Sequence, residues 1–213
     1  GAIVLNGAVI GEQFGSHDSI ATAQPLGALP GLNVPGTPTG FGFGAISVVG
    51  SIGLSTAGTS EDDLYSFEAQ AGDFVNIEVI SNALSRISDK IDSIVSVLDG
   101  SGLSIAYFTG TATSDDEFET QDAILIDLLI TTSGTYFIKV DTFSFAPATS
   151  LFDQFCQNPT SNPACADTDT GEYELFAWIY STDAQPAGGD TLIGGAGADS
   201  MTGSSGNDTV FSN

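Results

Sequence analysis

The strongest constraint on the fold is a nine-residue repeat in the stretch "GGDTLIGGAGADSMTGSSGNDTV", from Gly188 to Val210. In each copy a glycine stands two residues before an aspartate, and an apolar residue stands two residues after it. Glycine permits left-handed backbone and close packing, so carbonyl and carboxylate oxygens can converge into the all-oxygen shell that Ca²⁺ prefers. The aspartates are Asp190, Asp199 and Asp208, the glycines are Gly188, Gly197 and Gly206, and the apolar residues are Leu192, Met201 and Val210.

This pattern resembles the RTX, or hemolysin-type, calcium-binding repeat, Gly-Gly-x-Gly-x-Asp-x-apolar-x. The middle copy, "GGAGADSMT", matches fully, whereas Gln185 and Pro186 replace the leading glycines of the first copy and Ser204 replaces one in the third. The resemblance implies Ca²⁺ and a coil in which two repeats make one turn, with Asp190 and Asp208 on the same edge. A flexible Gly/Ser-rich linker is the alternative interpretation. The implied ligands are Asp190, Gly195, Gly197, Asp199, Gly206 and Asp208.

The charge balance is strongly acidic, with 27 Asp and Glu against Arg86, Lys90 and Lys139, which gives a net charge of −24. Such a surface repels phosphate backbones and excludes nucleic acid as a partner. Carboxylates at this density also repel one another and oppose compaction. High external salt or bound divalent cations relieve that repulsion, and the glycine-aspartate repeat favours the cations.

Short segments that alternate apolar and polar residues fill the middle of the chain, and turns such as "AQAGD", "DGSG" and "TTSG" separate them. Short strands at this spacing predict a β-sandwich or barrel. Helix is expected only at 18–26 or 81–91, and either segment is equally a loop. The expected strands span 45–52, 63–69, 73–80, 93–99, 104–109, 123–131, 135–142 and 172–180.

Five motifs occur in one order: "HDSIATAQPLG", "EDDLYSFEAQAGDFVNIEV", "DSIVSVLDGSG", "SGTYFIKV" and "GEYELFAW". Together they resemble the bacterial pre-peptidase C-terminal domain family. The resemblance implies a jelly-roll-like β-sandwich that accompanies secreted enzymes and surface proteins. Its members are usually non-catalytic; some bind calcium, and some bind collagen or other extracellular polymers. We expect an all-β chain with an N-terminal extension or strand at 1–11, this sandwich at 12–182 and a short RTX β-roll at 183–213.

Within the sandwich, Asp18, Glu61 and Asp63 are predicted to form a second calcium site, with exposed loop carboxylates as the alternative. The acidic stretch 114–122 is interpreted as a solvated loop, and Asp167 and Asp169 are open to both interpretations. His17 is the only histidine. It is predicted to lie in a surface loop, although an imidazole beside Asp18 also suggests a ligand or an acid-base group.

The two cysteines, Cys156 and Cys165, enclose the turn-prone spacer "QNPTSNPA". A disulfide between them is predicted, worth about 2.5–3 kcal/mol in the chain-entropy model, and it implies an oxidising compartment. Two free thiols are the alternative. One His and two Cys do not complete a zinc site unless carboxylates join them.

These features favour a secreted or cell-surface, calcium-binding accessory or adhesion module of a larger extracellular bacterial protein, without catalytic activity. Its partner would be an extracellular polysaccharide or protein, or copies of itself, with no membrane insertion because no apolar run is long enough. The first alternative is a structural subunit of a filament or surface layer, in which "GAIVLNGAVI" pairs with a neighbour's sheet edge. The second is a carboxylate-dependent glycoside hydrolase. Gly-x-Ser-x-Gly, P-loop and dinucleotide motifs are absent from the sequence.

Overall fold

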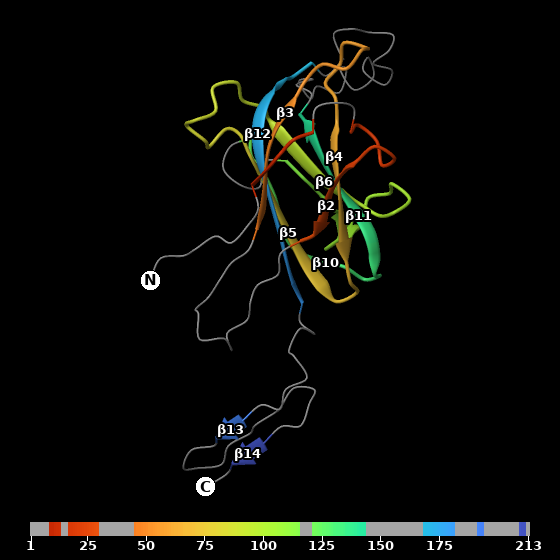
Figure 1. The fold of residues 1–213 in the computed structure, drawn as a ribbon, viewed down its shortest axis with the longest axis vertical. Coiled ribbons are helices and arrows are strands. Elements are labelled where there is room, and N and C mark those ends of the chain that lie inside the picture. Colours follow the sequence, from red (N-terminus) through yellow and green to blue (C-terminus); the bar gives the residue numbers. More distant parts are fainter. Residues whose placement is uncertain are drawn as a thin grey trace.

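The computed structural model of the chain describes residues 9–13, 17–29, 45–115, 121–143, 168–181, 191–193 and 209–211. Within these ranges the chain is all-β and contains no helix (Figure 1), as the alternating sequence predicts. The strands are β1 (Val9–Gly11), β2 (Gln24–Ala28), β3 (Ile46–Ile52), β4 (Asp63–Ala69), β5 (Asp73–Ile80), β6 (Ser93–Leu98), β7 (Ala106–Tyr107), β8 (Gly110–Thr111), β9 (Thr113–Ser114), β10 (Ala123–Leu129), β11 (Gly134–Thr142), β12 (Gly171–Ser181), β13 (Thr191–Ile193) and β14 (Thr209–Phe211).

Two five-stranded sheets form a sandwich around one apolar core. The strand order is β1-β3-β12-β5-β10 in the first sheet and β2-β4-β11-β6-β9 in the second. Buried and less buried residues alternate along β3 and β6, because successive side chains of a strand point to opposite faces of its sheet. The inward-facing side chains of Val75, Ile77 and Val79 on β5 are fully buried.

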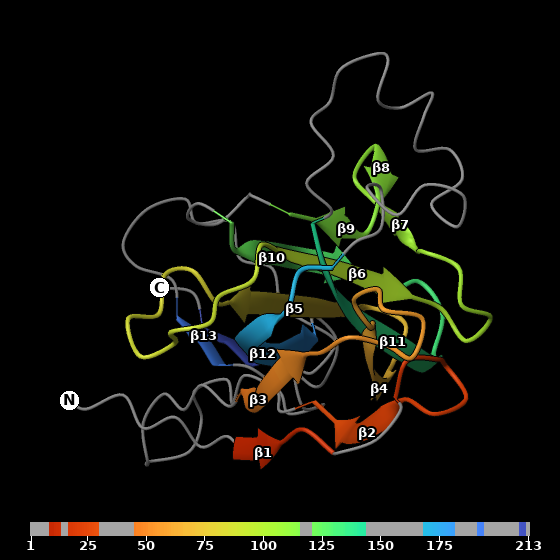
Figure 2. The same ribbon diagram turned by 90° about the horizontal axis from the view of Figure 1, so that it is seen from above.

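The N-terminal strands β1 and β2 lie at one border of the sandwich, each in a different sheet (Figure 2). β1 pairs in parallel with β3, and β2 pairs in parallel with β4. The connection between β1 and β2 therefore crosses from one sheet to the other. β1 pairs with a strand of its own chain, and assembly through a neighbour's sheet edge stays a prediction.

Two buried tyrosines from opposite sheets meet in the core. The hydroxyl oxygens of Tyr65 on β4 and Tyr173 on β12 lie 2.5 Å apart. The Tyr173 ring lies across Gly50, its cross-strand partner on β3. A glycine at this position leaves room for the ring, because a Cβ there would lie 2.5 Å from Cζ of Tyr173.

The two helix candidates form other structures. Residues 24–26 of the first belong to β2, and residues 81–91 of the second form turns. The turns of the second segment begin at the carboxylate of Asp122, which accepts backbone hydrogen bonds from Ser81, Asn82 and Ala83. Asp122 is fully buried and Ser114 nearly so, and the interpretation of 114–122 as a solvated loop is wrong at both of its ends.

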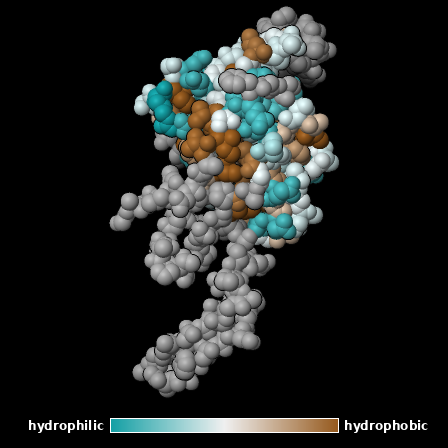
Figure 3. Space-filling view, viewed as in Figure 1, coloured by the Kyte–Doolittle hydropathy of each residue, from teal (hydrophilic) through white to brown (hydrophobic). Residues whose placement is uncertain are grey.

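The face of the sandwich drawn in Figure 3 combines an apolar area with hydrophilic residues around it. Exposed apolar side chains of the described residues include Val49 on β3 and Leu129 on β10. In the part of the chain that the structure describes, no helix is long and apolar enough to cross a membrane.

Candidate metal centres

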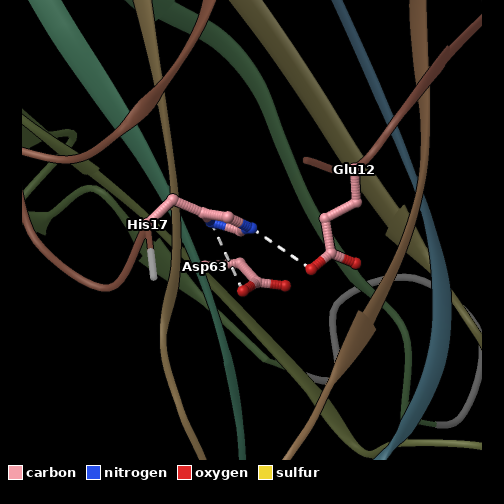
Figure 4. A group of neighbouring side chains, drawn as sticks. All are labelled: Glu12, His17 and Asp63. Atoms are coloured by element: carbon pink, nitrogen blue, oxygen red, sulfur yellow. Dashed lines mark hydrogen bonds and ion pairs between the residues drawn. The ribbon is translucent and has the colours of Figure 1, made fainter. Parts of the chain in front are cut away.

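The first candidate centre lies where the chain crosses between the sheets. Glu12 directly follows β1, His17 belongs to the β1–β2 connection, and Asp63 begins β4. Their ligand atoms lie within 4.8 Å of one another, and they are the one group of three or more His, Cys, Asp and Glu side chains so arranged among the described residues. The imidazole of His17 lies between the two carboxylates (Figure 4).

The imidazole presents each of its nitrogens to a different carboxylate. Nε2 of His17 lies 3.2 Å from Oε1 of Glu12, and Nδ1 lies 3.5 Å from Oδ1 of Asp63. The side chains of His17 and Asp63 are 5% and 2% exposed, whereas that of Glu12 is 18% exposed. The site is therefore dry around Asp63 and reaches solvent only at Glu12.

Hydrogen bonds from the surrounding strands position these three residues. The backbone N–H of Ser51 on β3 donates to Oε2 of Glu12 at 2.6 Å, and the hydroxyl of Tyr173 donates to Oδ2 of Asp63 at 2.6 Å. The backbone N–H of Leu64 donates to the carbonyl oxygen of His17 at 2.9 Å. Each carboxylate thus has one oxygen engaged by the fold and the other directed at the imidazole.

Burial raises the pKa of the Asp63 carboxyl to about 7. The negative charges of Glu12 and Glu61 contribute to this rise in pKa, whereas the hydrogen bond from Tyr173 and the nearby His17 oppose it. The site therefore holds its proton on Asp63 at pH values where an exposed aspartate is ionised.

We expect the stability of the metal-free protein to fall as pH rises from about 4 to about 7 through Asp63. In this window the folded chain keeps a proton that the unfolded chain has released. The free energy of unfolding therefore decreases by up to about 1.4 kcal/mol per pH unit. Urea unfolding in EDTA should show this slope, and the Asp63→Asn variant should lack it. Equal slopes in the two proteins would contradict the expectation.

The structure separates the three residues predicted as a second calcium site. Asp63 lies in the buried group, Asp18 is exposed, and Oε1 of Glu61 accepts the backbone N–H of Gly53 at 2.8 Å. Neither Asp18 nor Glu61 joins the group of Glu12, His17 and Asp63. Calcium binding by Asp18, Glu61 and Asp63 stays a prediction.

The prediction that His17 lies in a surface loop is wrong, because this side chain is buried. The sequence around it, "GSHDS", is polar and typical of an exposed turn. Its imidazole lies against Glu12 and Asp63 and against the ring of Tyr65, with the ring centroids 5.5 Å apart, and is buried there. Glu12 was missed for the same reason, although its distance of five residues from the only histidine is visible in the sequence.

The second candidate centre is the C-terminal repeat. β13 and β14 pair in parallel, with Leu192 opposite Val210 and Thr191 opposite Thr209. Partners in this register are two nine-residue repeats apart, which is the spacing expected when two repeats make one turn. Outside the described residues lie Asp190, Gly195, Gly197, Asp199, Gly206 and Asp208, and also Cys156 and Cys165 with their predicted disulfide.

Two segments of the chain match models of known families. Residues 61–142 match the bacterial pre-peptidase C-terminal domain, and residues 187–213 match the model described as "RTX calcium-binding nonapeptide repeat (4 copies)". Both resemblances seen in the sequence are confirmed, and Ca²⁺ is the ion that such repeats bind. Both families occur in secreted proteins and are generally non-catalytic. The boundaries of the three expected parts, 1–11, 12–182 and 183–213, stay a prediction.

No curated protein matches the chain. Among solved structures, the pre-peptidase C-terminal domain of a collagenase from Bacillus anthracis is 13% identical, with a TM-score of 0.37, and the match covers 74% of this chain and 93% of that one. PliG, a periplasmic inhibitor of g-type lysozyme from Aeromonas hydrophila, is 11% identical, with a TM-score of 0.34 and coverage of 72% and 98%. PliG from Salmonella Typhimurium is 13% identical, with a TM-score of 0.33 and coverage of 74% and 99%. The family assignments therefore rest on the two sequence models.

Proposed function

We propose that this chain, in which a pre-peptidase C-terminal domain is followed by RTX calcium-binding repeats, is a secreted accessory or adhesion module of a larger extracellular bacterial protein. It carries no catalytic activity in this proposal, and Ca²⁺ acts structurally. The observation that carries the proposal is the register of β13 and β14, in which paired residues are two repeats apart, the spacing expected when two repeats make one turn.

The charge of the chain supports a structural role for the ion. Against 27 acidic residues the chain has three basic ones. Arg86 pairs with Glu174, Lys139 lies 2.9 Å from Asp62 and 3.0 Å from Asp141, and Lys90 donates to the carbonyl oxygen of Asn82. Bound Ca²⁺ neutralises carboxylates that these few cations do not reach, so folding of the tail and ion binding are coupled.

An exposed aromatic ring, Phe108, supports contact with a polymer. Phe108 lies at the tip of the β7–β8 hairpin, is 85% exposed and has a positive φ of 47°. Its ring centroid lies 4.5 Å from that of Tyr107. A large exposed ring held in an unfavourable backbone conformation is typical of a binding surface rather than of a residue placed for stability.

We expect Ca²⁺ to raise the melting temperature of the full chain above its value in EDTA. Calcium at about 100 times its Kd contributes about 2.7 kcal/mol, which corresponds to a rise of roughly 5–10 °C for a chain of this size. Thermal melts monitored by circular dichroism measure this rise. In the same buffers, retention on immobilised polysaccharides and fibrillar proteins tests adhesion.

The variant Asp199→Asn alters the one repeat that matches the consensus fully and should reduce the calcium-dependent rise. Asp89→Asn removes the same charge from an exposed position of the sandwich and should leave it unchanged. Equal melting temperatures in Ca²⁺ and in EDTA would contradict the proposal. If the calcium-loaded chain is not retained on any of these polymers, only the adhesion part of the proposal is contradicted.

A further inference from the structure

We infer that Glu12, His17 and Asp63 form a second metal site that takes a transition-metal dication of the Zn²⁺ class, distinct from the Ca²⁺ of the repeats. His17 supplies one imidazole nitrogen, and Glu12 and Asp63 each supply one carboxylate oxygen, the three ligand atoms lying within 4.8 Å of one another (Figure 4). Water completes the coordination from the side of Glu12, the most exposed of the three. The inference rests on the sandwich alone and does not depend on the repeats.

The site contains a buried nitrogen that lacks a hydrogen-bond partner. Nδ1 of His17 is buried and has no hydrogen-bond partner among the described residues. It faces Oδ1 of Asp63 at 3.5 Å, which is longer than the 2.7–3.2 Å of an N–H···O bond. A buried polar atom without a partner costs free energy, and a cation placed between these two atoms removes that cost.

The spacing of the donor atoms fits such an ion. With Zn–N and Zn–O bonds of about 2.0–2.1 Å, two ligand atoms of a tetrahedral site lie roughly 3.3 Å apart. Nδ1 of His17 and Oδ1 of Asp63 lie 3.5 Å apart, and one ligand atom from each of the three residues lies within 4.8 Å of the other two. Because the 3.2 Å contact of Glu12 is with the other nitrogen, Nε2, an ion held by Nδ1 and Asp63 is completed by a shift of the Glu12 side chain.

The fold orients the two carboxylates as ligands. The outer oxygens of Glu12 and Asp63 accept hydrogen bonds from Ser51 and Tyr173, which leaves the inner oxygens free to face the imidazole. Hydrogen bonds of this kind fix ligand orientation in metal sites, and their loss typically weakens binding about 10- to 100-fold.

The site is short of positive charge. Glu12 and Asp63 place two carboxylates against one imidazole, and all three basic side chains of the chain interact elsewhere. A dication with a neutral imidazole balances both carboxylates.

The donor set selects against Ca²⁺. Calcium takes six to eight oxygen ligands, whereas this group offers one nitrogen and two inward oxygens in a nearly dry site. Imidazole suits zinc, copper, nickel and iron, and a mixed nitrogen and carboxylate set is common for zinc. One histidine and two cysteines do not form a zinc site by themselves. In this group the carboxylates of Glu12 and Asp63 supply the further ligands beside His17.

The chain offers a direct readout because His17 is its one imidazole. The full chain, with ¹⁵N-labelled histidine and saturated with Ca²⁺ after EDTA treatment, is titrated with ZnCl₂ while the ring nitrogens are followed by NMR. We expect one equivalent of Zn²⁺ to shift the ligating nitrogen, and Ca²⁺ alone to leave the ring unchanged. Zinc held by other carboxylates or by the cysteines does not move these signals.

Variants separate this site from nonspecific binding. By calorimetry, His17→Asn should weaken the tightest Zn²⁺ binding more than about 100-fold, because it removes a ligand and not only an outer-shell partner. Asp18→Asn, at an exposed neighbouring position, should leave the affinity within about twofold. The inference would be overturned if the ring nitrogen signals did not change on addition of Zn²⁺ or changed equally with Ca²⁺. Signals that remain those of a doubly protonated imidazolium would overturn it as well. The NMR result on the wild-type chain stands even if His17→Asn fails to fold.

Discussion

Replacing Asp122 with alanine is expected to lower the free energy of unfolding by about 3–5 kcal/mol. This fully buried carboxylate accepts backbone hydrogen bonds at 2.7 Å from Ser81 and at 2.8 Å from Asn82 and Ala83. Without it, three donors at the end of β5 lose their acceptor, and each buried donor left unsatisfied costs about 1–3 kcal/mol. Urea unfolding followed by the fluorescence of Trp178, the one tryptophan of the chain, measures the loss.

Two further variants sharpen the test at Asp122. Asp122→Asn keeps an oxygen for Ser81 and Asn82 but turns an amide N–H toward the donor of Ala83, so we expect an intermediate loss. Asp89→Ala removes an equal charge from an exposed position of the following turns and should change stability by less than about 0.5 kcal/mol. If Asp122→Ala and Asp89→Ala behave alike, the carboxylate does not organise these turns.

Replacing Gly50 with alanine is expected to destabilise the sandwich by about 2–3 kcal/mol, which lowers the melting temperature by roughly 5–10 °C. The new Cβ would lie 2.5 Å from Cζ and 2.6 Å from the hydroxyl oxygen of Tyr173. Neither group can yield easily, because Gly50 is fixed in β3 and Tyr173 is fully buried on the adjacent β12. Thermal melts in EDTA measure this effect without the contribution of calcium.

The control for Gly50 is Gly134 on β11, where an added Cβ meets no atom within 4 Å. Gly134→Ala should be neutral or slightly stabilising, because alanine loses less backbone entropy on folding than glycine. In a Tyr173→Leu background, which lacks Cζ and the hydroxyl, Gly50→Ala should cost much less than in the wild type. Equal costs in both backgrounds would show that the clash with Tyr173 is not the cause.

The sequence predicts the seven longer strands, β3 to β6 and β10 to β12, because each carries its own alternation of inward and outward residues, as along β3 and β6. The strand expected at 104–109 is only the two-residue β7. The short strand β2 was missed, since five residues carry little pattern and Pro25 resembles a helix stop, whereas β1 lies in the segment 1–11 that was expected as an extension or strand. Their pairing with β3 and β4 defines them, and this pairing depends on residues distant in the chain.

The two candidate metal centres also differ in how far the sequence predicts them. The repeat is visible in the sequence because its ligand residues recur every nine positions, and the pairing of Leu192 with Val210 follows that period. The group of Glu12, His17 and Asp63 has no such period. Its members meet because one connection crosses between the sheets, and local polarity alone predicted the opposite environment for His17.

The hydroxyl contact between Tyr65 and Tyr173 has a consequence for how the two layers are aligned. Apolar side chains attract one another without directional preference, so the core alone favours stacked sheets but tolerates sliding of one over the other. A hydrogen bond at 2.5 Å from β4 to β12, continued to Asp63, exists in only one alignment. This chain of hydroxyl and carboxyl groups therefore fixes the relative alignment of the two sheets. The apolar core holds the layers together, and the tyrosine hydroxyls determine their position along one another.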